Sequence, residues 1–203
     1  MSPRLLLLAA CVPLWLGVSN CWSQAPPVLV TDHDTPLQFN GFHVKPPGGE
    51  NWYRFIRNDG NVLFGKRIDS KTHTFTALVH SGLLPAGMAV SSVEDYFALV
   101  KKIKRAMISP QYLRFLEEEY ATENTPGRTC IRYRLRAEAI LAPQARSAPQ
   151  VLEFTGFSCA HPESLRTSID IHYSERGGPG PDSEGMRREG EEFIRGIVFT
   201  PLK

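Results

Sequence analysis

The stretch TCIRYRLRAEAI, residues 129–140, alternates apolar and charged side chains with a period of two. Successive side chains of a β-strand point to opposite faces, so this period predicts a strand with one buried face. The apolar side is made of Ile131, Tyr133, Leu135 and Ala137, and the polar side of Arg132, Arg134, Arg136 and Glu138. The fold therefore depends on which segment pairs with this strand.

A second strand is predicted for residues 151–159, VLEFTGFSC, after a loop rich in Pro and Ala. Cys130 lies near the start of the first strand and Cys159 at the end of the second, so an antiparallel hairpin can place them opposite each other. Directly opposed residues of a non-hydrogen-bonded pair are close enough for a disulfide. We predict this hairpin and a Cys130–Cys159 disulfide.

Two further residue pairs support that register. It places Leu135 opposite Phe154, an apolar pair, and Arg136 opposite Glu153, a pair of opposite charge. Both kinds of cross-strand contact stabilise a sheet. Because pairing the cysteines alone defines this register, these two pairs are the independent support for it.

The N-terminal segment has the pattern of a secretory signal peptide. Arg4 precedes a run without charge, residues 5–17, which is shorter than the roughly 20 apolar residues of a membrane-spanning helix. Small and polar residues follow, and we predict cleavage after Ser23, which makes residues 1–23 the signal. The mature chain is then exported, periplasmic or secreted, without a transmembrane helix. An oxidising compartment of this kind favours the disulfide.

An alternative is a lipid anchor. The stretch VSNC, residues 18–21, resembles the lipobox of bacterial lipoproteins, in which the cysteine is acylated and becomes the first mature residue. Asn20 departs from the small residue usual at its position. The chain would then be a membrane-anchored lipoprotein held through Cys21.

Composition argues against a nucleic-acid partner. The signal removes one of the 23 Lys and Arg residues and none of the 21 Asp and Glu residues, which leaves 22 against 21, a net charge of about +1. Nucleic-acid binders usually carry a strong basic excess gathered on one face.

After a flexible segment at residues 24–38, residues 39–203 have the length of a single domain.

The remaining pattern predicts further strands and two helices. Ser91 and Glu94 fit a capping box at the start of a helix that ends near Met107. Its apolar stripe is Val93, Tyr96, Phe97, Val100, Ile103 and Met107, and Lys101, Lys102, Lys104 and Arg105 are expected on its solvent face near the C-terminus. Strands are expected at residues 39–44, 52–56, 61–68, 74–80, 112–120 and 168–174, and a final helix at 184–198.

Short connections between these elements indicate an α+β fold, an antiparallel sheet with a central and a C-terminal helix packed on it. The layout resembles the PsbP-like family through GFHVKP at residues 41–46, Trp52, a mid-chain helix, a long hairpin and the ending FIRGIVF at residues 193–199. The resemblance spans roughly residues 39–199 and implies a small α/β/α sandwich. It also implies a noncatalytic, often exported or membrane-associated accessory module, with no catalytic residues to transfer.

Two arrangements of residues are candidates for a catalytic or metal site. Asp170, His172 and Ser174 share one face of a predicted strand, but spacings of two residues do not direct a base at its neighbour's hydroxyl. A metal site from Cys159, His161 and His172 would need the cysteine that the disulfide uses, and the spacing of these ligands is not tight. We therefore expect no catalytic residue, no metal and no cofactor.

Arg132, Arg134 and Arg136 form the one distinctive surface. They are either a solvated face partly neutralised by Glu138 and Glu153, or a binding surface for an envelope protein or an anionic membrane. Two functions stay open: a noncatalytic module of the bacterial cell envelope, and a small exported hydrolase or metal-dependent enzyme built on residues 161–174. Convergent buried polar groups in a deep pocket would favour the enzyme, and a shallow surface with solvated charges would favour the module.

Overall fold

The computed structural model describes residues 26–70, 72–84, 90–125, 128–140, 150–177 and 183–203. The predicted signal peptide, its cleavage site and Cys21 lie outside these residues, as does the Pro- and Ala-rich loop at 141–149. Neither described helix is long and apolar enough to cross a membrane.

The hairpin has the register that the sequence predicts. Strand β8 (Arg128–Ala139) is antiparallel to β9 (Gln150–His161), with Leu135 opposite Phe154 and Arg136 opposite Glu153. Cys130 lies opposite Cys159, with their Cα atoms 4.1 Å apart and their sulfur atoms bonded. The predicted disulfide is therefore present in the structure.

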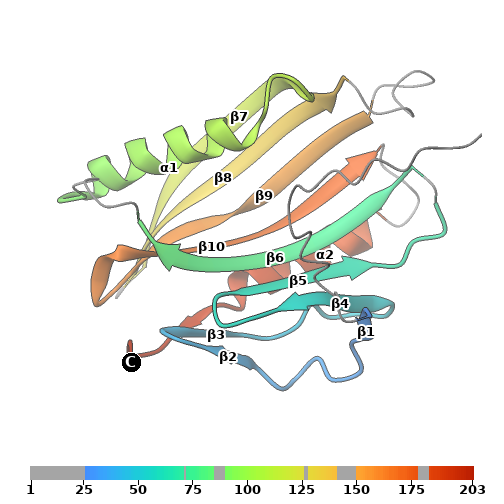
Figure 1. Cartoon of the computed structure of the whole chain (residues 1–203), viewed down its shortest axis with the longest axis horizontal. Coiled ribbons are helices and arrows are strands. Elements are labelled where there is room, and N and C mark those ends of the chain that lie inside the picture. Colours follow the sequence, from blue (N-terminus) through green and yellow to red (C-terminus); the bar gives the residue numbers. More distant parts are fainter. Residues whose placement is uncertain (1–25, 71, 85–89, 126–127, 141–149, 178–182) are drawn as a thin grey trace, which may run out of the picture.

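Eight strands form one antiparallel sheet in the order β1-β4-β5-β6-β10-β9-β8-β7 (Figure 1). The other strands are β1 (Val28–Leu29), β4 (Trp52–Arg57), β5 (Asn61–Lys66), β6 (Thr74–Leu83), β7 (Leu113–Thr125) and β10 (Ser164–Gly177). Strands β4 to β6 form one meander and β7 to β10 another, and the two join where β10 pairs with β6. This pairing places β10 at the centre of the sheet.

A small second sheet joins the two ends of the domain. It consists of β2 (Leu37–Phe39), β3 (Phe42–Val44) and β11 (Val198–Phe199), in the order β11-β3-β2. Strand β1 and the first two residues of β2 lie in the segment expected to precede the domain, where no strand was predicted. The strand predicted at residues 39–44 is interrupted by a turn at Asn40 and Gly41, so Phe39 ends β2 and Phe42 begins β3.

Helix α2 (Ser183–Arg195) covers one face of the large sheet, where Met186, Phe193 and Ile194 are buried in the main apolar core. The helix ends earlier than the predicted residue 198 because Gly196 follows it, and the Gly196 amide closes the last turn onto the carbonyls of Glu192 and Phe193.

Helix α1 (Val93–Met107) lies on the opposite face, so the domain has three layers and the predicted α+β architecture is confirmed (Figure 1). Its N-cap is Ser92, one residue later than the predicted Ser91. The Ser92 hydroxyl accepts from the Asp95 amide, and the Ser91 amide donates to the Asp95 carboxylate in return. The acidic residue of the capping box is therefore Asp95 and not the predicted Glu94.

The predicted faces of α1 need a larger correction. The buried residues are Tyr96, Val100 and Lys104, whereas Ile103 and Met107 of the predicted apolar stripe are exposed. Lys104, expected on the solvent face, is only 3% exposed. The helix thus turns a lysine toward the sheet and leaves two apolar residues at the edge of a cavity.

Candidate functional site

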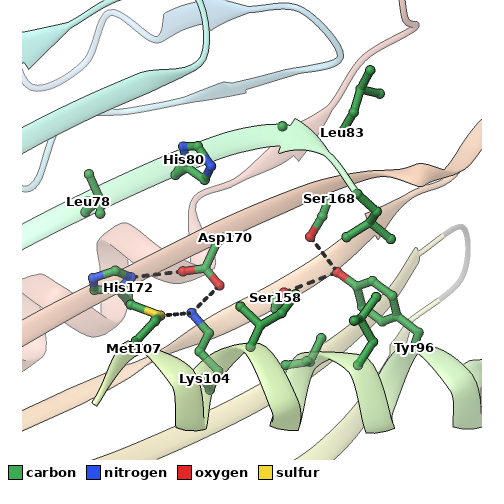
Figure 2. A pocket seen from close by; sticks show the side chains of 15 residues that line it. Leu78, His80, Leu83, Tyr96, Lys104, Met107, Ser158, Ser168, Asp170 and His172 are labelled. Atoms are coloured by element: carbon green, nitrogen blue, oxygen red, sulfur yellow. Dashed lines mark hydrogen bonds and ion pairs between the residues drawn. The ribbon is translucent and has the colours of Figure 1, made fainter. Parts of the chain in front are cut away.

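A pocket of about 260 Å³ opens between α1 and the face of the sheet formed by β6, β9 and β10 (Figure 2). Its walls are largely apolar: Leu99, Val100, Ile103 and Met107 come from α1, and Leu78 and Leu83 from β6. Leu83 is 73% exposed and Met107 48% exposed, so both lie at the mouth. The volume is just below the range of about 300–1,000 Å³ that is typical of small-molecule sites.

Four polar side chains meet on one side of the pocket. The Lys104 Nζ atom lies 2.5 Å from Asp170 Oδ2 and donates to the Tyr133 hydroxyl at 2.9 Å. The other carboxylate oxygen, Asp170 Oδ1, accepts from the Tyr133 hydroxyl at 2.9 Å and lies 3.0 Å from His172 Nδ1. Lys104 also lies 4.0 Å from the centre of the Tyr133 ring, a cation–π contact. We call these residues the Lys104 cluster.

The electrostatics of the cluster favour the ionised carboxylate. Burial opposes the ionisation of Asp170, but the Lys104 charge and the His172 hydrogen bond outweigh it and hold the Asp170 pKa well below its ordinary value. Burial and the nearby Asp170 charge raise the pKa of Tyr133 well above its ordinary value. At neutral pH the cluster therefore contains an ionised Asp170 and a neutral Tyr133, which acts as a hydrogen-bond bridge.

A second polar group lies farther along the pocket. The Tyr96 hydroxyl is 2.9 Å from Ser168 Oγ and 3.2 Å from Ser158 Oγ, so it joins α1 to β10 and β9 (Figure 2). Burial raises the Tyr96 pKa although the two hydroxyls oppose this shift. These three residues are neutral and satisfy one another.

A glycine makes room for the Lys104 cluster. Gly156 in β9 lies opposite both Tyr133 in β8 and His172 in β10. A Cβ atom at Gly156 would lie 2.5 Å from His172 Cβ and 2.3 Å from the carbonyl oxygen of Ile171. Only glycine fits here, and its missing side chain leaves the space in which the Tyr133 and His172 rings approach to 6.4 Å.

The structure brings together two of the three candidate catalytic residues of a hydrolase. Asp170 and His172 form a hydrogen-bonded pair in the pocket, and His172 is only 5% exposed. Ser174 does not join them, because its hydroxyl lies 2.7 Å from Thr76 Oγ1. The Asp170–His172 pair can hold an imidazole in one orientation, but a nucleophile must come from elsewhere.

The three candidate metal ligands, Cys159, His161 and His172, have other partners. Cys159 is in the disulfide, and His161 Nε2 lies 3.0 Å from each of the carbonyl oxygens of Gly41 and Thr200. His161 thus ties the end of β9 to the small sheet. Within the described residues, no group of three or more His, Cys, Asp or Glu side chains could hold a metal ion.

The arginine row lies beside α2, on the sheet face opposite the pocket. Arg132 pairs with Glu191 at 3.4 Å, Arg134 with Glu153 at 2.9 Å, and Arg136 with Glu117 at 3.0 Å and with Glu153 at 3.6 Å. Glu138, expected to neutralise the row, pairs with Arg114 instead. Each guanidinium group already has a carboxylate partner, which weakens the case for an anion-binding surface, and the binding role stays a prediction.

Sequence reasoning missed Lys104 although a signal for it exists. Tyr96, Val100 and Lys104 follow each other at intervals of four, so the lysine continues the buried stripe of α1. A second signal is the strand predicted at residues 168–174, in which Asp170 and His172 share one face. Since β10 is a central strand, both of its faces are covered, and a buried acid there needs a buried base.

Comparisons with known proteins give a likeness of fold alone. A scan against family models finds no match, and a search of curated proteins finds none either. Among solved structures, cyanobacterial PsbP (CyanoP) from Synechocystis sp. PCC 6803 is similar, with a TM-score of 0.37 and 9% identity over 79% of this chain and 87% of that chain. The resemblance to the PsbP-like family is limited to this level and assigns no ligand, partner or activity.

Proposed function

We propose that this chain is an exported, noncatalytic accessory or binding module of the bacterial cell envelope, with the pocket beneath α1 as its ligand site. The proposal rests on one observation: the pocket has largely apolar walls, and its buried charges already neutralise each other. The Lys104 ammonium group is held by Asp170, and Asp170 accepts from three donors. Charges that are fully paired stabilise the fold and leave the pocket free to bind by shape and apolar contact.

Export is supported by the disulfide and by the N-terminal pattern. The Cys130–Cys159 bond suits an oxidising compartment, and residues 1–23 carry the features of a signal peptide. Fractionation of cells that express the full chain should place it outside the cytoplasm. Mass analysis of the mature N-terminus then distinguishes a free Gln24 from a lipid-modified Cys21.

The ligand site can be tested by complementation of a deletion strain. Ile103 and Ala106 are both exposed residues of α1, but only Ile103 lines the pocket. Ile103→Glu places a charge at the pocket mouth and should abolish complementation, whereas the matched control Ala106→Glu should complement fully. Equal complementation by the two variants at equal protein levels would contradict the proposal.

A second candidate, a small exported enzyme, is favoured by the Asp170–His172 pair. The pair lies among convergent buried groups in a pocket, which is the arrangement that the sequence analysis associated with an enzyme. A general base typically contributes 10²- to 10⁴-fold to a rate, about 3–5 kcal/mol, whereas one hydrogen bond to a bound ligand contributes about 0.5–1.5 kcal/mol. His172→Gln should therefore abolish function in an enzyme and only weaken it in a binding module.

A further inference from the structure

We infer that the pocket beneath α1 binds an uncharged amphipathic molecule with a hydrocarbon body and a hydrogen-bond donor, such as a hydroxyl group, at its head. This inference rests on the proposed function and names the class of its ligand. Three features carry it: the walls of the pocket, the balance of its charges and the two imidazole rings that line it.

The walls define the body of the ligand. Four apolar residues of α1 face two of β6 across the pocket, and apart from the Met107 sulfur, which accepts from Lys104 Nζ at 3.8 Å, none of these side chains offers a hydrogen bond. Ile103, Met107 and Leu83 remain exposed at the mouth, where a bound hydrocarbon would cover them. Covering apolar surface of this kind contributes roughly 25 cal/mol per Å².

The charged groups in the pocket indicate that the ligand is uncharged. One cation, Lys104, and one anion, Asp170, lie in the pocket and are paired with each other at 2.5 Å. A charged head group entering the pocket would lose its hydration and find no free counter-ion. The pocket therefore disfavours both carboxylates and ammonium groups.

The imidazole rings define the head group. His172 Nδ1 lies 3.0 Å from a carboxylate oxygen of Asp170, and His80 Nδ1 lies against the amide oxygen of Asn61. Both oxygens can only accept, so Nδ1 is the donor in each ring, and Nε2 is the acceptor that an imidazole with this tautomer offers. Neither Nε2 atom has a partner among the described residues. His80 lies opposite Asp170 on the neighbouring strand, so the two rings are diagonal neighbours that line the pocket (Figure 2). A ligand with a hydrogen-bond donor at its head group would satisfy these two acceptors.

The test uses the folded mature protein and four probes with the same chain: 1-octanol, 1-methoxyoctane, octanoate and octylammonium. Binding is measured by displacement of uncharged N-phenyl-1-naphthylamine near neutral pH. We expect 1-octanol to bind about 3- to 10-fold more tightly than 1-methoxyoctane, which lacks the donor, and at least about 10-fold more tightly than either ion. His80→Leu removes one of the two acceptors and should reduce the preference for the alcohol over the ether, whereas the control His43→Leu on β3 should keep it.

Two results overturn the inference in different ways. Equal binding of alcohol and ether, or tighter binding of either ion, shows that the class of ligand is wrong while the pocket remains a binding site. If no probe binds and Ile103→Glu also complements the deletion, the proposed function fails together with the inference.

Discussion

The ammonium group of Lys104 in α1 lies 2.5 Å from the carboxylate of Asp170 at the centre of the sheet. Both side chains are largely buried, at 4% and 16% exposure, and Tyr133 bridges them. The pair fastens the second half of α1 to β10 beside the pocket. The position of the helix, and with it the width of the pocket, therefore depends on a polar contact.

Lys104→Met should destabilise the protein by about 3 kcal/mol, because it leaves Asp170 buried without its cation. The double variant Lys104→Met/Asp170→Asn should recover part of this loss, since it retains no uncompensated charge. Urea unfolding at neutral pH measures both values. A single variant within about 0.5 kcal/mol of wild type would show that the pair does not stabilise the helix on the sheet.

The Asp170 pKa makes stability depend on pH in a defined direction. Because the folded protein lowers this pKa below 3.8, the ionised carboxylate stabilises the fold fully above that value and loses its contribution as the pH falls through the folded-state pKa. Lys104, Tyr133 and His172 contact this carboxylate. We expect the melting temperature of wild type to fall more steeply than that of Asp170→Asn between about pH 5 and about pH 2. Parallel curves would contradict this role for Asp170.

Gly156→Ala should destabilise the protein by at least about 1–3 kcal/mol, because the new methyl group would clash with the backbone of Ile171 and the side chain of His172. Gly185→Ala in α2 is the matched control, since a Cβ there has no neighbour within 4 Å and alanine favours a helix. Denaturant unfolding compares the two. Equal stabilities would show that the close approach at Gly156 relaxes without cost.

Arg136→Gln should cost no more than about 1 kcal/mol, because Arg136 is partly exposed, its close partner Glu117 is too, and its second partner Glu153 lies at 3.6 Å and keeps Arg134 as a partner. The triple variant of Arg132, Arg134 and Arg136 to Gln also tests the membrane prediction. If the row is a membrane surface, wild type should sediment with phosphatidylglycerol vesicles and the triple variant should not. Absence of wild-type binding would reject an anionic membrane as the partner of the row.

The fold was largely predictable from the sequence because its hairpins obey local rules. The period of two at residues 129–140 fixes which side chains share a face, and the two cysteines fix the register of β8 against β9. The pairing of β6 with β10 joins segments about a hundred residues apart, and no local pattern specifies it. Strand β1 has only two residues, which is too short for a period to be recognised.

The candidate site was less predictable because it depends on that long-range pairing. The sequence predicts that Asp170 and His172 share one face of a strand, and the β6–β10 contact together with α1 makes that face the floor of a pocket. The same contact places His80 opposite Asp170. Lys104 could have been assigned to the buried stripe by its spacing, but its partner on β10 becomes visible only in the folded chain.

Loss of the disulfide should lower stability without abolishing ligand binding. The bond closes a loop of 29 residues, and removing a native disulfide typically costs about 2–5 kcal/mol. Cys130 and Cys159 are buried in the core beside α2, on the sheet face opposite the pocket. Cys130→Ala/Cys159→Ala should therefore melt at a lower temperature yet still bind 1-octanol.

Reductant added to wild type provides the control for this variant, because it breaks the bond and leaves both sulfur atoms in the core. A similar fall in melting temperature would assign the loss to the bond, whereas a fall only in the double variant would assign it to the lost sulfur packing. Non-reducing peptide mapping of protein from the envelope checks the pairing directly. Free thiols at Cys130 and Cys159 would show that the bond does not form in the cell, and would remove a main support for export.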